Sequence, residues 1–438
     1  MKNSLKAISF LVLSFTLISI ILLVSCVTTG KKVNIVLIVI DTLRPDHLPF
    51  YGYQKNTAPF LSEIANKGLI FENAYTTSSW TAPATASIFT SLYPFQHGVV
   101  TGFQATKRLE KVDPKITLNK IPAKIKTIAE ILKDSGYKTF CVSDNFNVCK
   151  EMRFAQGFDH FRSHPYKGAE LVNSELQDWE TKIKDGNPYF LYIHYMDPHL
   201  PYHERSPWFK EPSKKKFRRK AAYDSEISYV DSKIEEMFNL FKWNKNTLLI
   251  VTSDHGEEFN EHGNNGHGKT LYSEVLHVPL LIYYPEFGFK NKRIAENVSV
   301  IDILPTIGEF VGLSPGNYEG KSLMPLFNSE KLSENKRYLY SHLHRRKGEF
   351  DKDVIKKSVI LDNWKYIVTF PDYEELYNLA EDPNEKLNKM SENSDIAESM
   401  KYKLFDFERN CKKYTKETFE KTLDKDMLEK LKSLGYIK

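Results

Sequence analysis

Two short apolar runs constrain this chain most, because each of them ends in residues that can bind a metal. The first run, NIVLIVID, ends at Asp41, and the second, TLLIVTSDH, ends at Asp254 and His255. Runs of Val, Ile and Leu this short, bounded by polar residues, are typical of strands buried on both faces of a parallel sheet. Open α/β sheets hold their ligands at the carboxyl ends of such strands. The pattern therefore predicts an α/β fold with these three side chains around a divalent cation, although a single strand-end aspartate often only caps a loop.

A third segment, SSWTAPATASIFTSLYP, supplies a candidate nucleophile. Pro83, followed by small and apolar residues, predicts a helix with proline at its first position. Thr81 would then lie just outside the helix N-terminus, where free N–H groups and the positive end of the dipole favour an anion. A cation held nearby would activate its hydroxyl for attack. The alternative is a helix-capping Ser/Thr cluster, and position alone does not separate the two readings.

Seven motifs follow one another along the chain, namely NIVLIVIDTLRPDHLPFYGY, SSWTAPATASIFTSLYPFQHGV, FLYIHYMDPHLPY, SDHGEEFNEHGNNGHGK, IDILPTIGEFVGL, ELYNLAEDPNEKLN and LKSLGYI. In this order and spacing they resemble the sulfatase family of the alkaline-phosphatase-like superfamily. The resemblance implies a large, mainly parallel β-sheet sandwiched by helices, with a small C-terminal α+β subdomain. It also implies that Asp41, Asp254 and His255 bind the metal and that Thr81 is both nucleophile and metal ligand. His199 would contact the anionic group of the substrate.

The glycine-rich stretch EEFNEHGNNGHGK follows His255 directly. Glycine-rich loops at strand ends bend around sites. We therefore expect His267 and Lys269 to make catalytic contacts with the charged oxygens of an ester, with His262 behind them as a substrate-binding residue. The alternative is that these are ordinary surface side chains.

The chain departs from the sulfatase signature at the position of the nucleophile. That signature is Cys or Ser, any residue, Pro, any residue, Arg, and its Cys or Ser is converted to formylglycine. The corresponding residues here are TAPAT, from Thr81 to Thr85. Threonine cannot be oxidised to formylglycine, so none is expected, and the signature arginine is missing. Arg44 either takes over the binding of substrate charge or braces its own loop.

Two further departures concern the metal. Thr42 stands where a second metal-binding aspartate is usual, and His255 stands where an asparagine is usual. Both changes remove oxygen ligands in favour of imidazole, so the expected divalent ion is zinc, manganese or calcium, and the first two suit the site better. Superfamily members with a threonine nucleophile and an Asp-His pair mostly act on phosphate esters. The sequence leaves open whether Asp197, His199 and His267 hold a second metal.

Three functions compete at this point. The first is a metal-dependent sulfatase-family hydrolase that cleaves a sulfate or phosphate ester through Thr81. The second is a phosphodiesterase or a phosphoryl-group (phosphoethanolamine-like) transferase that acts on envelope lipids or glycans. The third is a non-catalytic binding lipoprotein, against which the retention of the presumed site residues argues. The formal net charge of +5 is small for 438 residues, so nucleic acid is not an expected partner. The expected partner is an anionic ester, and the sequence does not indicate an oligomeric state.

The N-terminus predicts a membrane-anchored lipoprotein of the cell envelope, on the periplasmic or outer-membrane side. Lys2 and Lys6 form a charged start, residues 10–24 are apolar apart from Ser and Thr, and Cys26 follows Leu-Val-Ser. This pattern predicts a signal peptide over residues 1–25, cleavage before Cys26 and lipidation of that cysteine. The alternative is an uncleaved membrane helix, since about twenty apolar residues span a bilayer.

The rest of the chain divides into a lipid-anchored linker (26–32), a catalytic domain (33–334) and a C-terminal subdomain (335–438). The subdomain is expected to hold a small antiparallel sheet and a helical tail, because short strands replace the alternation of strands and helices. The cysteines allow two alternatives, a Cys141–Cys149 disulfide that leaves Cys411 unpaired, or three buried thiols. The basic run KKKFRRK (214–220) is either a funnel for anions or a solvated segment before the next helix.

Overall fold

The computed structural model describes residues 32–103, 115–314, 316–328, 332, 336–345, 354–422, 425 and 427–429. The expected signal peptide, Cys26 and the closing LKSLGYI motif lie outside these ranges. Among the described residues, no helix has the length and apolar character needed to cross a bilayer. The prediction of a lipid anchor therefore stays a prediction.

A mostly parallel, eight-stranded sheet forms the centre of the described chain, in the strand order β11-β2-β10-β7-β1-β6-β4-β5. The prediction of a mainly parallel sheet is confirmed, because β1 runs parallel to β6 and β7, β4 to β5 and β6, and β2 to β11. The strand bounds are β1 (Asn34–Ile40), β2 (Leu69–Tyr75), β4 (Lys138–Ser143), β5 (His160–Ser163), β6 (Tyr189–Tyr195), β7 (Thr247–Thr252), β10 (His277–Tyr283) and β11 (Lys292–Ser299).

Strand β10 runs antiparallel to both of its neighbours, β2 and β7. A parallel return needs a crossover, usually a helix. Between β7 and β10 the chain instead forms the short hairpin of β8 (Glu258–Phe259) and β9 (Asn265–Gly266) and the four-residue helix α10 (Ser273–Leu276). The chain therefore re-enters the sheet at the edge where β7 ends, and β10 runs antiparallel to β7.

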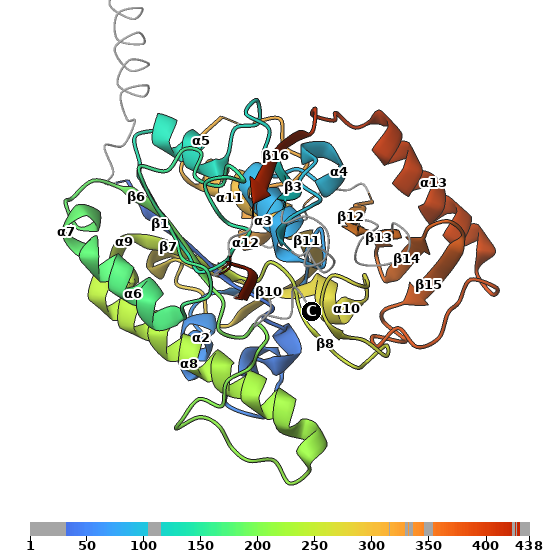
Figure 1. The fold of residues 1–438 in the computed structure, drawn as a ribbon, viewed down its shortest axis with the longest axis horizontal. Coiled ribbons are helices and arrows are strands. Elements are labelled where there is room, and N and C mark those ends of the chain that lie inside the picture. The colour runs from blue at the N-terminus through green and yellow to red at the C-terminus, as the bar shows by residue number, and fades with distance from the viewer. Residues whose placement is uncertain are drawn as a thin grey trace, which may run out of the picture. The chain divides into compact units, whose positions relative to one another are not determined.

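Helices cover both faces of this sheet (Figure 1). Alternate side chains of β1, such as Val36 and Ile38, pack with α2, α6 and α8 in one core, as the two-residue period of a strand requires. Helices α3, α5 and α11 lie on the other face. The helix bounds are α2 (Pro59–Ala65), α3 (Thr81–Thr90), α4 (Pro94–His97), α5 (Ile128–Asp134), α6 (Ala169–Asp178), α7 (Glu180–Ile183), α8 (Arg218–Phe241), α9 (Trp243–Asn246), α11 (Ile303–Phe310), α12 (Met324–Phe327) and α13 (Ser394–Asn410).

The start of α3 corrects the expectation for Thr81. Trp80 has an extended backbone and occupies the N-cap, so Thr81 is the first helical residue rather than the residue outside the helix. Pro83 is then the third residue, which still lies in the first turn, where a missing N–H costs no helical hydrogen bond. All ten residues of α3 are buried, so the N-terminus of this helix points into the protein and not into solvent.

The C-terminal part contains the expected antiparallel sheet, which has four strands in the order β12-β13-β14-β15. The prediction of a helical tail is only half right. Helix α13 packs on this sheet, but the chain then forms β16, which pairs antiparallel with β3. Alternation in residues 417–422 is weak, so the sequence did not indicate that strand. The bounds are β3 (Lys115–Lys120), β12 (Leu339–Arg345), β13 (Val354–Leu361), β14 (Trp364–Thr369), β15 (Tyr373–Asn378) and β16 (Glu417–Thr422).

Two smaller predictions are settled by the fold. Cys141, Cys149 and Cys411 are all free thiols, and Cys411 is only half-buried. The basic run 214–220 is an exposed segment that becomes the first turn of α8, and its Arg218 pairs with Glu204 and Glu211. The reading as a solvated segment therefore fits the structure better than a funnel.

Candidate active site

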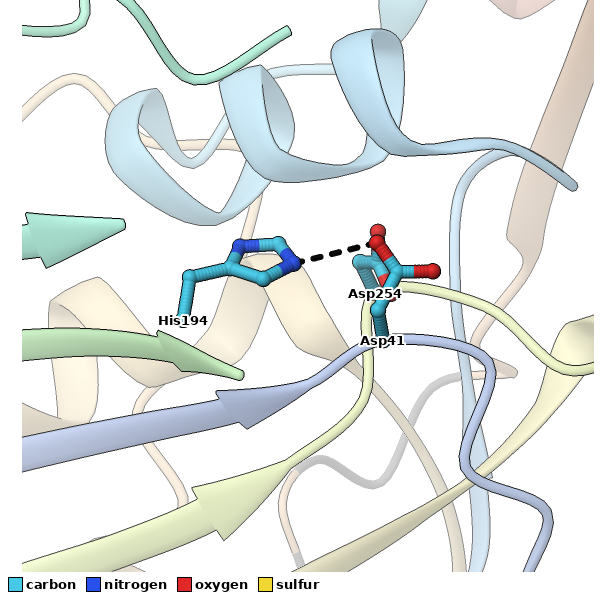
Figure 2. A group of neighbouring side chains, drawn as sticks. All are labelled: Asp41, His194 and Asp254. Carbon is cyan, nitrogen blue, oxygen red and sulfur yellow. Dashed lines mark hydrogen bonds and ion pairs between the residues drawn. The ribbon is translucent and has the colours of Figure 1, made fainter. Parts of the chain in front are cut away.

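Four adjacent strands, β7, β1, β6 and β4, deliver polar side chains to one place at the carboxyl edge of the sheet. Asp41 follows β1, Asp254 and His255 follow β7, and Asn145 follows β4. His194 lies on β6 directly opposite Val39 of β1, so its ring stands beside Asp41. Figure 2 shows Asp41, His194 and Asp254 pointing toward one another below α3.

The hydroxyl of Thr81 contacts this cluster instead of capping its helix. Its Oγ1 lies 3.3 Å from Asp41 Oδ2 and 3.3 Å from His255 Nε2. Asn145 Nδ2 donates to Asp41 Oδ2 at 2.7 Å and to Thr81 Oγ1 at 3.3 Å. The N-cap residue of α3 makes no side-chain cap. Of the two readings of Thr81, the geometry therefore supports a site residue.

The two carboxylates have the features of a cation site. Within the described residues, Asp41 Oδ1 and Asp254 Oδ2 are buried and have no hydrogen-bond partner, although His255 Nε2 lies 3.6 Å and 3.4 Å from them. Burial and the nearby charge of Asp41 raise the pKa of Asp254. For Asp41, burial is outweighed by the hydrogen bond from His194 and the charges of neighbouring histidines, and its pKa is lowered. Two buried acids whose charges repel each other are stabilised by a cation between them, so the residues fit a metal ion.

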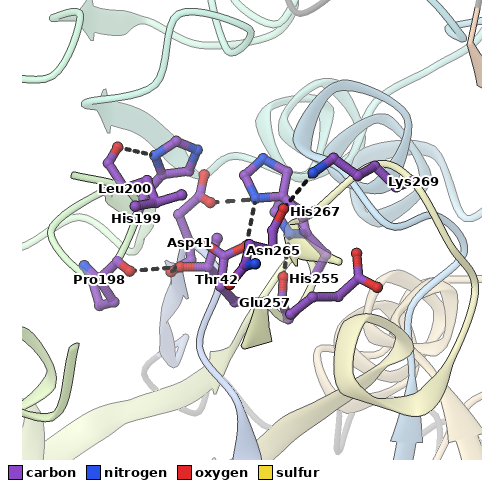
Figure 3. Close-up of polar contacts among 12 residues, drawn as sticks. Asp41, Thr42, Pro198, His199, Leu200, His255, Glu257, Asn265, His267 and Lys269 are labelled. Carbon is purple, nitrogen blue, oxygen red and sulfur yellow. Dashed lines mark hydrogen bonds and ion pairs between the residues drawn. The ribbon is translucent and has the colours of Figure 1, made fainter. Parts of the chain in front are cut away.

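A second group of side chains lies beside this cluster. Figure 3 shows His255, His267 and His199 in succession, with ring centroids 4.4 Å and 4.8 Å apart. Glu257 Oε1 lies 3.1 Å from His267 Nδ1, and Tyr202 donates to Glu257 Oε2 at 2.8 Å. Burial lowers the pKa of both His199 and His267, so both rings are neutral at neutral pH. Glu257 fixes His267 with Nε2 as the ring nitrogen available to a substrate.

Four candidate residues do not reach the cluster. Lys269 donates its amine to Asn265 O at the outside of the loop (Figure 3). His262 stacks on Tyr272 and lies 2.6 Å from a carboxylate oxygen of Glu274.

Arg44 and Asp197 are also engaged elsewhere. Arg44 pairs with Asp46 and Glu261 and donates to Glu257 O, which is the loop-bracing alternative. Asp197 accepts hydrogen bonds from Ala169 N at the start of α6 and from Arg205. Its carboxylate is therefore not directed to a second metal site with His199 and His267.

Three residues of the site were missed by sequence reasoning. Asn145 comes two residues after the buried strand KTFCVS, and the rule that found Asp41 would also have found it. Glu257 lies in the glycine-rich stretch but was not given a role. His194 carried a weaker signal, a single histidine within the otherwise apolar YFLYIHY, where it resembles any core residue of a fully buried strand.

Fold and site together define an α/β ester hydrolase with a metal-type cluster and a hydroxyl nucleophile candidate. The family model described as Sulfatase matches residues 33–313, and one described as N-sulphoglucosamine sulphohydrolase, C-terminal, matches residues 261–410. The chain therefore belongs to the sulfatase family. The resemblance found in the sequence and the prediction of a sulfatase-family ester hydrolase are both confirmed.

Individual relatives are distant. An ulvan-active sulfatase of Formosa agariphila is 23% identical over 81% of this chain and 70% of its own length. A Δ4,5-hexuronate-2-O-sulfatase of Bacteroides thetaiotaomicron is 22% identical, over 82% and 84%. A solved complex with D-glucosamine-2-N,6-O-disulfate has a TM-score of 0.70 at 17% identity, over 86% and 98% of the chains. The phosphonate monoester hydrolase of Agrobacterium radiobacter has a TM-score of 0.67 at 17% identity, over 90% and 97%.

Proposed function

We propose that this protein is a metal-dependent hydrolase in which Thr81 attacks a sulfate or phosphate ester. The observation that carries the proposal is the position of the Thr81 hydroxyl, 3.3 Å from both Asp41 Oδ2 and His255 Nε2. The same residue begins α3, whose N-terminal amides and dipole favour the negative charge of an ester group. The proposed nucleophile therefore lies at the helix end that would bind the anionic group of the ester.

The metal would be held by Asp41, Asp254 and His255, with Thr81 as a further oxygen ligand. When bound, such an ion lowers the pKa of a coordinated hydroxyl and polarises the ester. A donor set that mixes carboxylate and imidazole suits zinc or manganese better than calcium. Because position 81 is threonine, we expect no formylglycine in the mature protein.

The chain's own residues then account for a double displacement. The hydroxyl of Thr81 donates toward Asp41, which gives its proton a direction in which to leave. Its oxygen forms a bond to the phosphorus or sulfur, the ester bond to the leaving oxygen breaks, and that oxygen takes up a proton. Water then attacks the threonine ester, releases the anion and restores the hydroxyl.

His199 and His267 are proposed to bind the oxygens of the ester group. His267 lies next to His255, and His199 lies next to His267. Because the N–H of each neutral ring is directed to Glu257 or to Leu200 O, Nε2 would donate to an ester oxygen only in the protonated ring, a form that the negative charge of a bound ester favours. Glu257 holds His267 in place, and its negative charge would stabilise the protonated ring. Lys269 bonds to Asn265 O, and Arg44 pairs with Asp46 and Glu261, so each would contribute only after its own loop rearranges.

The substrate class follows from the relatives only in outline. The named relatives act on ulvan and on a hexuronate 2-O-sulfate, and one solved neighbour holds a disulfated glucosamine. These names support an anionic sugar ester, whereas the phosphonate monoester hydrolase shows that the fold also accommodates phosphorus. The alternative of a phosphodiesterase or phosphoryl-group transferase rests on Thr81 itself.

The test is a set of parallel assays of the purified, zinc- or manganese-loaded protein. Aryl sulfate, phosphate monoester, phosphodiester and phosphonate ester are offered at equal concentration, with and without an alcohol acceptor. Turnover of any ester that disappears with chelator supports the proposal, and product on the acceptor identifies a transferase. If the metal-loaded protein turns over none of the four esters, the result would favour a non-catalytic binding lipoprotein.

We also propose that the protein is anchored to the cell envelope through lipidated Cys26. The support is the pattern of charged start, apolar stretch and small residue before the cysteine. Changing Cys26 to Ser should release or misprocess the protein, because the thioether needs that sulfur. Mass spectrometry of the mature N-terminus checks this, and an intact leader in the membrane would contradict it.

A further inference from the structure

His194 is the most deeply enclosed titratable side chain at the cluster that the proposed function does not use. It is fully buried, as are Asp41 and Asp254. Its Nε2 lies 3.2 Å from Asp41 Oδ2. One nitrogen of His194 and one oxygen from each aspartate all lie within 4.8 Å of one another (Figure 2). Three donors this close, all without access to solvent, can share one ion.

The ring is held in this orientation from behind. The hydroxyl of Tyr192 lies 2.8 Å from His194 Nδ1, and both residues belong to the fully buried strand β6. A histidine that binds a metal through one nitrogen commonly donates its other N–H to an oxygen, which fixes the tautomer. Tyr192 is placed to accept that hydrogen bond, and in that tautomer Nε2, which here lies against Asp41 Oδ2, would present its lone pair to a cation.

The neighbouring donors leave room for such a ligand. Thr42, the residue after Asp41, uses its hydroxyl on the carbonyls of Asp41 and Pro198. Its hydroxyl is thereby held against the backbone. Asn145 donates its amide N–H to Asp41 and so holds that carboxylate instead of competing for the ion.

We propose that His194 is a metal ligand through Nε2, so that two imidazoles, His194 and His255, bind the ion together with two carboxylates. The inference rests on the metal dependence in the proposed function. Two nitrogen donors select zinc and similar transition metals against calcium and magnesium, which take oxygen ligands. The alternative is that His194 only pairs with the charge of Asp41.

The first measurement counts imidazoles in the wild-type protein. The full-length protein in detergent is stripped with chelator and loaded with one equivalent of Cu²⁺, and pulsed electron paramagnetic resonance detects the remote nitrogen of each bound imidazole. We expect two imidazoles in the wild type and one in His194→Gln. A single imidazole in the wild type overturns the inference, and this result does not depend on whether the variant folds.

The second measurement is zinc affinity by competition with a chromophoric chelator. His194→Gln should weaken zinc binding by more than about 100-fold, since loss of an outer partner alone typically costs roughly 10–100-fold. Tyr192→Phe should fall within that smaller range. The matched control His97→Gln removes a buried histidine outside the cluster, whose Nε2 lies 3.1 Å from Ser87 Oγ, and it should leave zinc affinity unchanged. Equal affinity of His194→Gln and wild type would make His194 a charge partner of Asp41. A wild type that binds no divalent ion would instead contradict the proposed function itself.

Discussion

At the scale of single residues, the proposed mechanism depends on Thr81. A formylglycine diol releases sulfate by collapsing to an aldehyde, and a threonine ester has no such exit. Its intermediate must be hydrolysed by water, a route that is familiar for phosphoryl transfer and unfavourable for an ordinary sulfate ester. The contacts of Thr81 with Asp41 and His255 are compatible with either ester. We therefore expect phosphate-ester turnover to exceed sulfate-ester turnover.

Replacing Thr81 tests this expectation. Thr81→Ala should lower kcat by several orders of magnitude, as loss of a nucleophile does elsewhere, while zinc affinity changes much less. Thr81→Ser keeps the hydroxyl and should retain much of the activity. Steady-state kinetics on a phosphate ester, with bound zinc measured in parallel, checks both variants. An active alanine variant, or a wild type that strongly prefers aryl sulfate, would contradict the mechanism.

The cluster that forms the candidate site was predictable where a residue ends an element. Asp41, Asp254 and Thr81 stand at the boundaries of apolar runs, and such boundaries can be read without knowing the fold. His194 and Glu257 could not be identified in that way. His194 depends on the register of β6 against β1, and Glu257 depends on a contact with His267 across the loop. Both are long-range properties that no local pattern reports.

The segment between β7 and β10 is the element on which the site most depends. The segment leaves the sheet after β7 and then packs on the backbone of α10. Gly256 lies at this crossing, where there is no space for a side chain. A Cβ on Gly256 would lie 2.1 Å from Glu274 O and 3.2 Å from Val275 Cα. Both atoms belong to the backbone, so the close approach cannot be relieved by a side-chain rotation. The same crossing carries the hydrogen bond from Gly256 N to Val275 O.

Gly256→Ala should therefore destabilise the protein by about 1–3 kcal/mol, the usual cost of overpacking, and weaken zinc binding by moving His255. Urea unfolding and chelator competition measure the two effects. Gly308→Ala is the matched control, because a Cβ in that turn of α11 meets no atom within 4 Å. It should be neutral or stabilise by roughly 0.5–1 kcal/mol. Equal stability of the two variants would show that the crossing is not tight.

The ion pair of Arg44 and Glu261 ties the loop after β1 to the loop after β7. The atoms are 2.9 Å apart, and Glu261 is mostly buried. Burial opposes ionisation of Glu261, but Arg44 and Lys220 lower its pKa to about 2. Its unfolded value is about 4.3, so the stabilisation is complete above that pH and is lost as pH falls toward 2.

Glu261→Gln should reduce the free energy of unfolding by about 1–3 kcal/mol at pH 7, and by roughly half as much near pH 3. Denaturant titrations at the two pH values give the difference. The control Asp406→Asn removes the partner of Arg409 in a more exposed pair 3.6 Å apart. It should change stability by less than about 0.5 kcal/mol at either pH. A deficit of Glu261→Gln that does not depend on pH would argue against the ion pair.

The elements themselves were predictable to different degrees. Strands such as β1 and β7 are continuous apolar runs, so their presence and their burial follow from local sequence. The direction of β10 does not, because it depends on how residues 253–276 turn. The pairing of β16 with β3 joins segments about three hundred residues apart along the chain and is supported by Glu417 contacts to Arg153 and Ala123 N. Such a contact leaves no local signal.

At the scale of the whole molecule, the sheet brings residues that are far apart along the chain to one place. The site residues come from β1, α3, β4, β6 and β7, so between residues 34 and 255 nearly every element must be in place before the cluster exists. The unfolded chain therefore has no preformed metal site. Any ion that binds the cluster binds the native state alone, and its binding free energy adds to the free energy of unfolding.

Metal loading should consequently raise the melting temperature. At a free zinc concentration about 100 times Kd, the native state gains about 2.7 kcal/mol, which calorimetry resolves as a shift of Tm. The size of the shift should depend on pH. The raised pKa of Asp254 means that this carboxyl binds a proton more tightly in the metal-free native state than in the unfolded chain, so its contribution to stability declines as pH rises above the unfolded value of about 3.9. Zinc would compete with the proton for Asp254 and relieve the repulsion with Asp41, so the gain in Tm should be larger at pH 8 than at pH 5. Asp254→Asn, which lacks the charge, should show a smaller gain and little dependence on pH. A wild-type Tm that chelator leaves unchanged at both pH values would mean that the buried carboxylates do not bind the ion.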